Sequence, residues 1–425
     1  MNATSLAPAI AHYRDAFEHL RPALAGAPSQ RAAAMQRFVE LGFPGAREEA
    51  WKYTNLRRLE SRRFVPAAPG TAAVAAPDAL VAQRIVLFNG APTQPLPAAM
   101  AGFALGTLTP NTGDPLLRPL TGGGTERFAA LNAALSTGPL LLSMAANQRC
   151  DELLQLTLLT GGNAPTLASP RIVVRMAAGS RGRLLIEHAD DGGQEHFTNA
   201  VLDVELGAGA QLTVYRLQHQ GERAFHIERI DARVAENASF LLRDSQLGGS
   251  LARLDVQVSL DGRAASTEVT GVFLADGARH LDTHVLIGHH AIETTSLQDY
   301  RGIAANRGRG VFNGKTIVHQ GAQKSNARQT NRNLLLTSGA EIDTKPDLEI
   351  YADDVQCSHG TTTGQLDPNA LFYLRSRGLN EAEARSALTR AFAGAVLARV
   401  DVPALAAYVQ HALDQRLVRL LEVAT

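Results

Sequence analysis

The chain has 425 residues, which is longer than one hydrophobic core usually supports, so we expect a main body with smaller appended domains. Lys plus Arg equals Asp plus Glu at 41 each and no long basic block occurs, so the sequence offers no electrostatic source for nucleic-acid binding. It shows neither a basic-led apolar leader nor a run of about 18 apolar residues, which predicts a cytoplasmic protein that does not engage a membrane.

Residues 1–80 are expected to form an N-terminal helical region followed by a linker. Ser29 is placed to cap a helix that Gly42 and the residues after it stop. Residues 66–80 are rich in Ala and Pro and show no periodicity, which is typical of a linker. A domain boundary is therefore predicted near residue 80.

Residues 81–150 form a mixed segment that leads into the core. A short strand is expected from Ile85 to Phe88, between loops rich in Pro and Gly. A helix is expected from Thr125 to Ala134.

Residues 151–364 are predicted to be the β core. Short strands rich in Val, Ile, Leu and Thr follow small turn pairs; Gly209-Ala210, for example, precedes Leu212 to Leu217. No helical segment long enough for a βαβ crossover separates the strands, which excludes a doubly wound sheet and a TIM barrel. A sandwich, a barrel or a β-solenoid remains. We favour the solenoid because its turns are short and recur on small residues, and because stacked coils bury apolar side chains that one coil cannot.

Residues 365–425 are expected to be a C-terminal helical domain. Asn380 with Glu383 forms a capping-box pattern, and Pro403 opens a second helix. Apolar residues recur along one face of each helix, which predicts packing on the domain's own core, with docking of another protein as the alternative. The apolar positions of the first helix are Ala384, Ala387, Leu388, Ala391, Phe392, Val396 and Leu397.

The sequence contains no nucleophile elbow, no phosphate-binding loop and no zinc-protease helix, so neither an enzyme nor a nucleotide-binding chain is predicted. Four glycines, Gly302, Gly308, Gly310 and Gly314, do not open a helical pattern and are assigned to β turns.

Four histidines lie close together in the sequence: His280, His284, His289 and His290. Imidazole is a common ligand for borderline metal ions, so this group is one candidate metal site. We favour a structural interpretation in which these histidines lie on alternating strands as outward polar residues.

Cys357 and His359 are the candidate metal ligands of most interest. They stand two apart in an extended segment, so thiolate and imidazole project to the same side and could bind one soft ion. The only other cysteine is Cys150, which argues against a disulfide framework. Iron-sulfur clusters usually take four protein ligands, so a partner would have to complete a cluster here. The alternative is a buried, inert Cys beside an ordinary strand His.

Several sequence blocks resemble the SufB/SufD family of iron-sulfur cluster assembly scaffolds. The Cys-Ser-His-Gly block and the Gly-Gln-Leu-Asp block are closer to SufD than to SufB. The blocks are Gly42-Phe43-Pro44 with Trp51-Lys52-Tyr53-Thr54, residues 325–336, 345–350, 353–360, 364–367 and 371–378.

The resemblance implies a mainly β protein with a right-handed parallel β-helix core flanked by helical segments. It implies a non-catalytic scaffold that pairs with SufB edge to edge, and that forms a homodimer when alone. A transient iron-sulfur cluster would be shared with SufB through His359 and Cys357. The C-terminal helices would dock SufC, an ABC-type ATPase, through Glu381, Ala384, Leu388, Phe392 and Val396.

Two alternatives stay open at this point. A β-helix can be an exported polysaccharide lyase or hydrolase, for which Asp353-Asp354 is the only adjacent acidic pair we would consider. It can also be a purely structural solenoid, in which changing Cys357 or His359 would have no effect.

Overall fold

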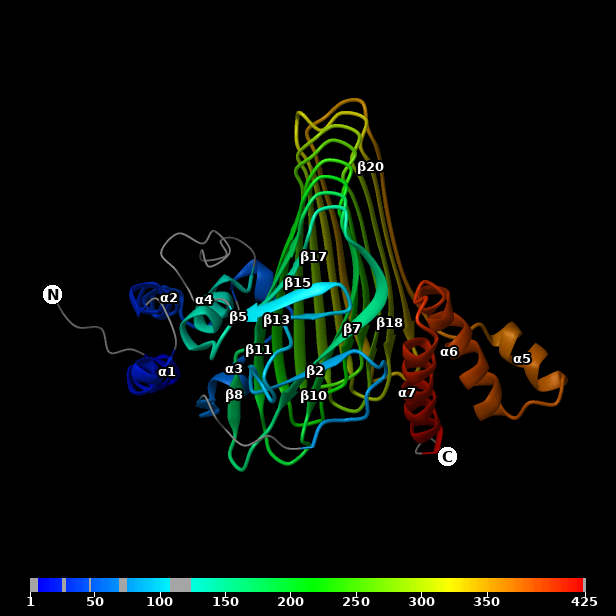
Figure 1. Ribbon diagram of the computed structural model, residues 1–425. Helices are drawn as coiled ribbons and strands as arrows, with labels where there is room; N and C mark the ends of the chain where they lie inside the picture. The colour runs from blue at the N-terminus through cyan, green and yellow to red at the C-terminus, as the bar shows by residue number, and fades with distance from the viewer. Residues whose placement is uncertain (1–6, 25–27, 46, 69–74, 108–123, 423–425) are drawn as a thin grey trace.

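The computed structural model describes residues 7–24, 28–45, 47–68, 75–107 and 124–422, with side chains described up to residue 418. Its body is a parallel β-solenoid of about eight turns made of two facing sheets. Helices lie on both sides of this body, the N-terminal group beside one sheet and the C-terminal group beside the other (Figure 1). This architecture confirms the predicted fold class.

The helices and strands follow one another along the chain in an order typical of a solenoid with flanking helices. The helices are α1 Pro8–Leu20, η1 Arg21–Ala23, α2 Pro28–Leu41, η2 Glu49–Trp51, α3 Arg57–Glu60, α4 Glu126–Leu135, α5 Pro368–Ser376, α6 Glu381–Leu397 and α7 Pro403–Glu422. The strands are β1 Val65–Pro66, β2 Arg84–Phe88, β3 Ala91–Pro92, β4 Ala99–Met100, β5 Phe103–Thr107, β6 Leu140–Met144, β7 Arg149–Thr160, β8 Thr166–Ala168, β9 Arg171–Met176, β10 Arg181–Asp190, β11 Phe197–Leu206, β12 Gln211–Gln218, β13 Phe225–Val234, β14 Ser239–Gln246, β15 Leu251–Leu260, β16 Ser266–Ala275, β17 His280–His289, β18 Thr295–Ala304, β19 Arg309–Val318, β20 Asn326–Leu335, β21 Glu341–Ile350 and β22 Gln356–Gly364.

Each coil of the solenoid gives one strand to each sheet. The first sheet has the order β21-β19-β17-β15-β13-β11-β9-β6-β5-β4, and the second has the order β22-β20-β18-β16-β14-β12-β10-β7-β2-β3. Equivalent positions recur at intervals from 26 residues, between Phe225 and Leu251, to 32 residues, between Arg309 and Glu341. Inward Val, Ile, Leu and Phe side chains from both sheets form the core between them.

The corner that leads from the first sheet to the second has the same backbone form in successive coils. One residue at each corner has a positive φ, and its N–H donates to a carbonyl of the next coil, as Gly179 does to Ala208 at 2.8 Å. Gly and Asn adopt this conformation most readily, which is why small turn residues recur in the sequence. The corner residues are Asn147, Gly179, Gly209, Asn237, Ala264, Glu293 and Lys324.

The N-terminal helices cover the outer face of the first sheet. Phe197 and Phe225 project outward from β11 and β13 into a cluster with Phe64, Phe128 and Trp51. Aromatic side chains carry large apolar area, so this cluster fixes the helical region on the sheet.

The C-terminal helices α6 and α7 pack on the outer face of the second sheet. Leu217 and Val272 of that sheet are buried in one cluster with Leu397, Val409 and Leu413. None of the helices that the structure describes combines the length and the low polarity that crossing a bilayer requires.

The capping box at Asn380 is confirmed, because its side chain accepts from the Glu383 N–H while the Glu383 carboxylate accepts from the Asn380 N–H. The expected cap at Ser29 is wrong, because α2 already begins at Pro28. Of the expected linker, residues 69–74 lie outside the described residues.

Three of the four glycines assigned to turns lie inside strands instead. Gly302 is in β18, and Gly310 and Gly314 are in β19; only Gly308 lies between strands. A Cβ on Gly310 would come within 2.5 Å of the Phe273 ring. These glycines therefore make room for large side chains that cross the narrow core.

Candidate functional site

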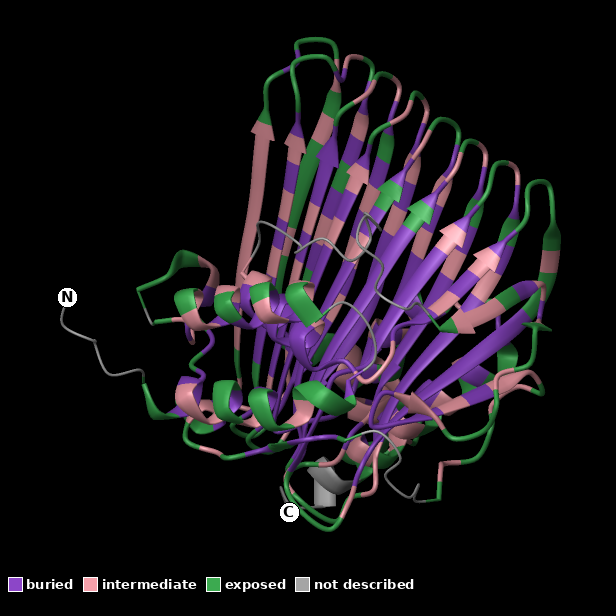
Figure 2. Cartoon of the chain, turned by 60° about the vertical axis from the view of Figure 1, so that its left-hand side comes forward, coloured by how far each residue is buried: buried purple, intermediate pink, exposed green. Residues whose placement is uncertain are grey.

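The last coil of the solenoid is open at its outer edge. Among the described strands, β21 pairs only with β19 and β22 only with β20, whereas the first coil is covered by the short antiparallel strands β3, β4 and β5. Figure 2 shows β21 as partly exposed along its length, at the left-hand edge of the sheet, next to mostly buried strands. This end therefore presents two unpaired strand edges and the uncovered end of the core.

The two predicted ligands lie on β22 and face the inside of the solenoid at this open end. Thr361, on the same face of β22, bonds across to Thr344 of β21 at 3.1 Å and to Asn331 of β20. Because side chains alternate along a strand, Cys357 and His359 share that inward face. His359 is exposed even so, because no coil covers it among the described residues.

The Cys357 thiol is half-buried against Val318, Ala322 and Ala352. Burial raises the pKa of this thiol, while a hydrogen bond from the Ala327 backbone acts in the opposite direction. The free chain therefore holds a protonated thiol, which a bound metal would have to deprotonate. About 6.6 Å of strand separates the Cα atoms of Cys357 and His359, since each residue advances about 3.3 Å.

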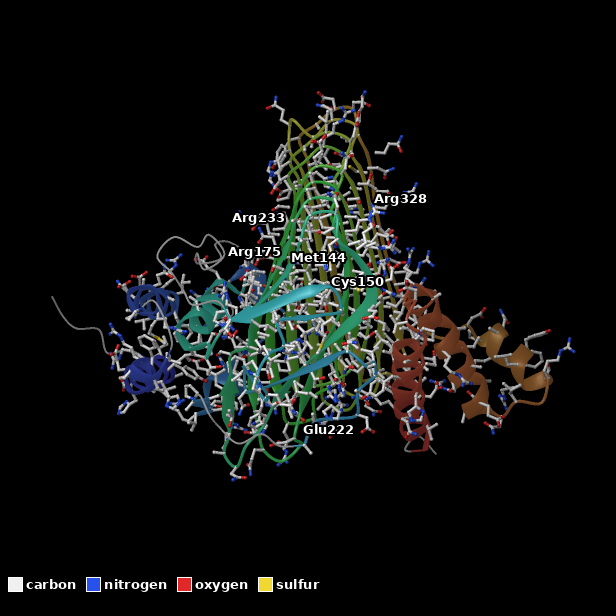
Figure 3. The ribbon with its side chains drawn as sticks, in the orientation of Figure 1. Met144, Cys150, Arg175, Glu222, Arg233 and Arg328 are labelled. Carbon is white, nitrogen blue, oxygen red and sulfur yellow. The ribbon has the colours of Figure 1, made fainter. Side chains whose placement is uncertain are left out.

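No second cysteine of this chain can complete the site. Cys150 lies near the start of β7, at the opposite end of the solenoid and close to Met144 (Figure 3). Seven ladder steps separate β7 from β22, which is about 34 Å at about 4.8 Å per step. Within the described residues, no other His, Cys, Asp or Glu joins Cys357 and His359 in a group compact enough for one ion.

The only such compact group in the described chain is buried in the middle of the solenoid. His188, His226 and Glu228 have donor atoms within 4.8 Å of one another. Both imidazoles lie about one hydrogen-bond length from the same Glu228 oxygen, His188 at 3.1 Å and His226 at 3.0 Å. Arg216 donates to that oxygen at 2.7 Å and to Asp244 at 2.7 Å.

Arg216 already supplies the cation that this buried group needs. Burial opposes ionisation of Glu228, yet Arg216 and His188 hold the pKa of that carboxyl well below its usual range. Burial also lowers the pKa of His226 to about 3, so this imidazole stays neutral. The cluster is a carboxylate held inside the core by Arg216 and flanked by two imidazoles, and we assign it to stability.

The sequence analysis placed the four histidines between 280 and 290 on alternating strands, and this prediction is wrong. His280, His284 and His289 all lie on β17, and His290 directly follows it. His289 is buried and bonds to Thr294 and Ser296 hydroxyls, while His284 pairs with Asp282 at 2.9 Å.

The N-terminal motif around Trp51 has a structural role in this chain. The Trp51 ring is buried under the Arg253 guanidinium, 3.9 Å from ring centroid to Cζ, and its indole N–H donates to Gly124. Arg253 also donates to the Ala50 carbonyl and to Asp282. The motif thereby anchors the N-terminal region to the charged outer face of the first sheet.

The five predicted ATPase contacts on α6 differ in exposure. Ala384 and Val396 are buried inside this chain, Leu388 and Phe392 are half-buried, and Glu381 is exposed. The Phe392 ring packs under Arg301 of the solenoid, with 5.0 Å from Cζ to the ring centroid.

Helix α5, which the sequence analysis did not single out, extends away from the solenoid and packs on α6 (Figure 1). None of its residues is buried. Phe372 and Tyr373 on this helix are 74% and 57% exposed. Phe372 has the highest exposed fraction of the large apolar side chains in the described chain.

Comparisons with known proteins agree with this geometry. Residues 158–392 match the sequence model of the family described as SUF system FeS cluster assembly, SufBD core domain. The chain is 33% identical to an iron-sulfur cluster assembly SufBD family protein of Synechocystis, over 89% of this chain and 88% of the relative. It is 30% identical to the iron-sulfur cluster assembly protein SufD of Escherichia coli, over 90% and 91%. A SufBD family protein of Mycobacterium tuberculosis is 28% identical over 87% and 89%.

Proposed function

This chain belongs to the SufBD family of the SUF iron-sulfur cluster assembly system, and from that premise we propose that it is a non-catalytic cytoplasmic scaffold subunit. It builds a nascent cluster together with a second, SufB-like subunit. The observation that carries the proposal is the pair of soft donors, Cys357 and His359, on an edge strand whose outer side has no neighbour in the described chain. Two ligands are too few for a cluster, so the partner contributes the others.

The SufB-like subunit pairs with the open edges of β21 and β22. Main-chain hydrogen bonds along an added strand supply affinity, and the uncovered inward faces supply specificity. Ile350 and Tyr351, at the end of β21, are 44% and 60% exposed and extend the contact surface at this end. Without the SufB-like subunit, the same edges pair two copies of this chain.

A SufC-like ABC ATPase docks on α5 and α6. Glu381, Leu388 and Phe392 contribute from α6, whereas Ala384 and Val396 act from inside by holding the helix on the fold. Residues 365–425 form the docking unit and residues 151–364 the scaffold body. Because Arg385 donates to the Leu336 carbonyl, which directly follows β20, movement of α6 reaches the strand next to β22.

The alternative of a polysaccharide-degrading enzyme receives no support. Asp353 and Asp354 are exposed turn residues, and no compact group of three metal-ligating side chains in the described chain includes them. The family relationship points to cluster assembly instead.

The test is reconstitution of the complex with a SufB-like subunit and the ATPase, using His359→Ala and Cys357→Ser. We expect cluster yield to fall strongly for His359→Ala, because a ligand is lost. Asn326→Ala, on the neighbouring strand and outside the site, is the control and keeps the wild-type yield. Wild-type yield in both ligand variants would favour a purely structural solenoid.

A further inference from the structure

The inward face of the second sheet becomes polar towards the open end. One column of side chains runs through successive coils as Val269, Gln298, Gln329 and His359, on β16, β18, β20 and β22. Gln298 is 0% and Gln329 2% exposed. Two glutamines therefore lie stacked below the proposed ligand His359, where earlier coils carry apolar residues.

Each of these amides is only half satisfied. The Gln329 Nε2 donates to the Gly314 carbonyl at 3.0 Å, and the Gln298 Nε2 donates to the Thr316 hydroxyl at 3.0 Å. The Oε1 atoms of both glutamines are buried and accept no hydrogen bond in the described structure. A buried acceptor without a donor is unfavourable, so a donor that reaches it forms a stable hydrogen bond.

The opposite sheet is shaped to admit these amides. A Cβ on Gly314 would lie 2.4 Å from the Gln329 Nε2 and 2.7 Å from the Gln298 Oε1. The glycine in the middle of β19 therefore preserves the space in which the two amides meet.

We propose that the Gln329 Oε1 accepts an N–H from the His359 imidazole and thereby positions it. The two residues are register partners on adjacent strands, about 4.8 Å apart, and both lie on the inward face of the second sheet. One ring nitrogen then carries the proton, and the other presents its lone pair to the open end as the metal ligand. Gln329 is a positioning residue, and this role rests on the proposed function of His359.

Gln298 provides a matched control. It lies in the same column and is equally buried, its Nε2 also donates at 3.0 Å, here to the Thr316 hydroxyl, and its Oε1 also lacks a donor in the described structure. It is two coils from His359, about 9.6 Å, which is beyond hydrogen-bond reach. Gln298→Met and Gln329→Met therefore each remove one buried amide, but only Gln329→Met removes the proposed acceptor for His359.

The test is nitrogen NMR of the full-length chain with 15N-labelled histidine, using His359→Ala to assign the ring signals. We expect a single His359 tautomer in the wild type and in Gln298→Met, and a mixture in Gln329→Met. Gln329→Glu restores the single tautomer, because a carboxylate oxygen in the same place accepts the same N–H. The same tautomer in Gln329→Met as in the wild type, or an equal change in Gln298→Met, would overturn the proposal.

Cluster yield in the reconstituted complex then separates this inference from the proposed function. A tenfold or larger loss in Gln329→Met, with Gln298→Met unchanged, is expected for a lost orienting partner. If the tautomer changes as expected while His359→Ala keeps full cluster yield, the hydrogen bond stands and the ligand role of His359 fails.

Discussion

Replacing Arg216 with Met removes the cation that bonds to the buried carboxylates of Glu228 and Asp244. Arg216 bonds to Glu228 and to Asp244, each at 2.7 Å, and all three side chains are at most 2% exposed. Met keeps most of the apolar volume of the arginine stem, so the charge is the main quantity that changes. In the described structure Glu228 then keeps the His226 imidazole at 3.0 Å, and Asp244 keeps only the long contact from the Tyr300 hydroxyl at 3.5 Å.

The expected loss is about 3–5 kcal/mol in the free energy of unfolding, the scale for removing one partner of a buried ion pair. At an m-value of about 3 kcal/mol per M, the urea midpoint falls by about 1–1.7 M. Without the cation, the pKa values of both carboxyls rise above their unfolded values. The folded variant then binds protons that the unfolded chain does not, so its deficit shrinks as pH falls from 8 to 5.

Urea unfolding followed by circular dichroism of the strands measures this loss. The triple variant Arg216→Met, Glu228→Leu, Asp244→Leu removes the whole charge group and is expected to regain most of the stability, because apolar side chains need no partner. A loss under about 1 kcal/mol in the single variant, or a triple variant less stable than the single one, would refute the interpretation of this cluster as a buried ion network.

Three further predictions concern other parts of the chain. Phe372→Asp on exposed α5 is expected to abolish co-purification with the ATPase without changing thermal unfolding, whereas retained binding would place the docking surface elsewhere. Burial lowers the pKa of His289 to about 4, so the unfolded chain takes up its proton first and stability is lost as pH falls from about 6.5 to about 4. His289→Gln should therefore reduce the slope of the unfolding free energy against pH in this range by up to about 1.4 kcal/mol per pH unit, and an unchanged slope would contradict the neutral buried imidazole. Trp51→Ala should cost about 3–5 kcal/mol and speed trypsin cleavage of the N-terminal region, and wild-type cleavage would show that the Arg253 contact is not an anchor.

The stacked architecture could be predicted because each coil repeats a local requirement. Positive-φ corners favour Gly and Asn, as at Gly209 and Asn237, and inward strand positions need apolar residues. The helices after Gly364 were equally predictable, since the Asn380 capping box is a local pattern. The two ligand candidates followed from their spacing of two along an extended segment.

The contents of the core could not be predicted because coil length varies between 26 and 32 residues. The sequence alone therefore does not reveal that Gln298, Gln329 and His359 form one column. It also does not reveal that Arg216 meets Glu228. The glycine assignment failed for the same reason, since Gly314 is required by an amide from the opposite sheet rather than by a turn.

The most direct test of the shared-cluster account is pulsed EPR of a reduced cluster assembled on the complex, with 15N-histidine incorporated only into this chain. The account predicts a 15N coupling to the cluster that disappears in His359→Ala and persists in Gln298→Met. A cluster that forms at wild-type yield with no 15N coupling from this chain would contradict it.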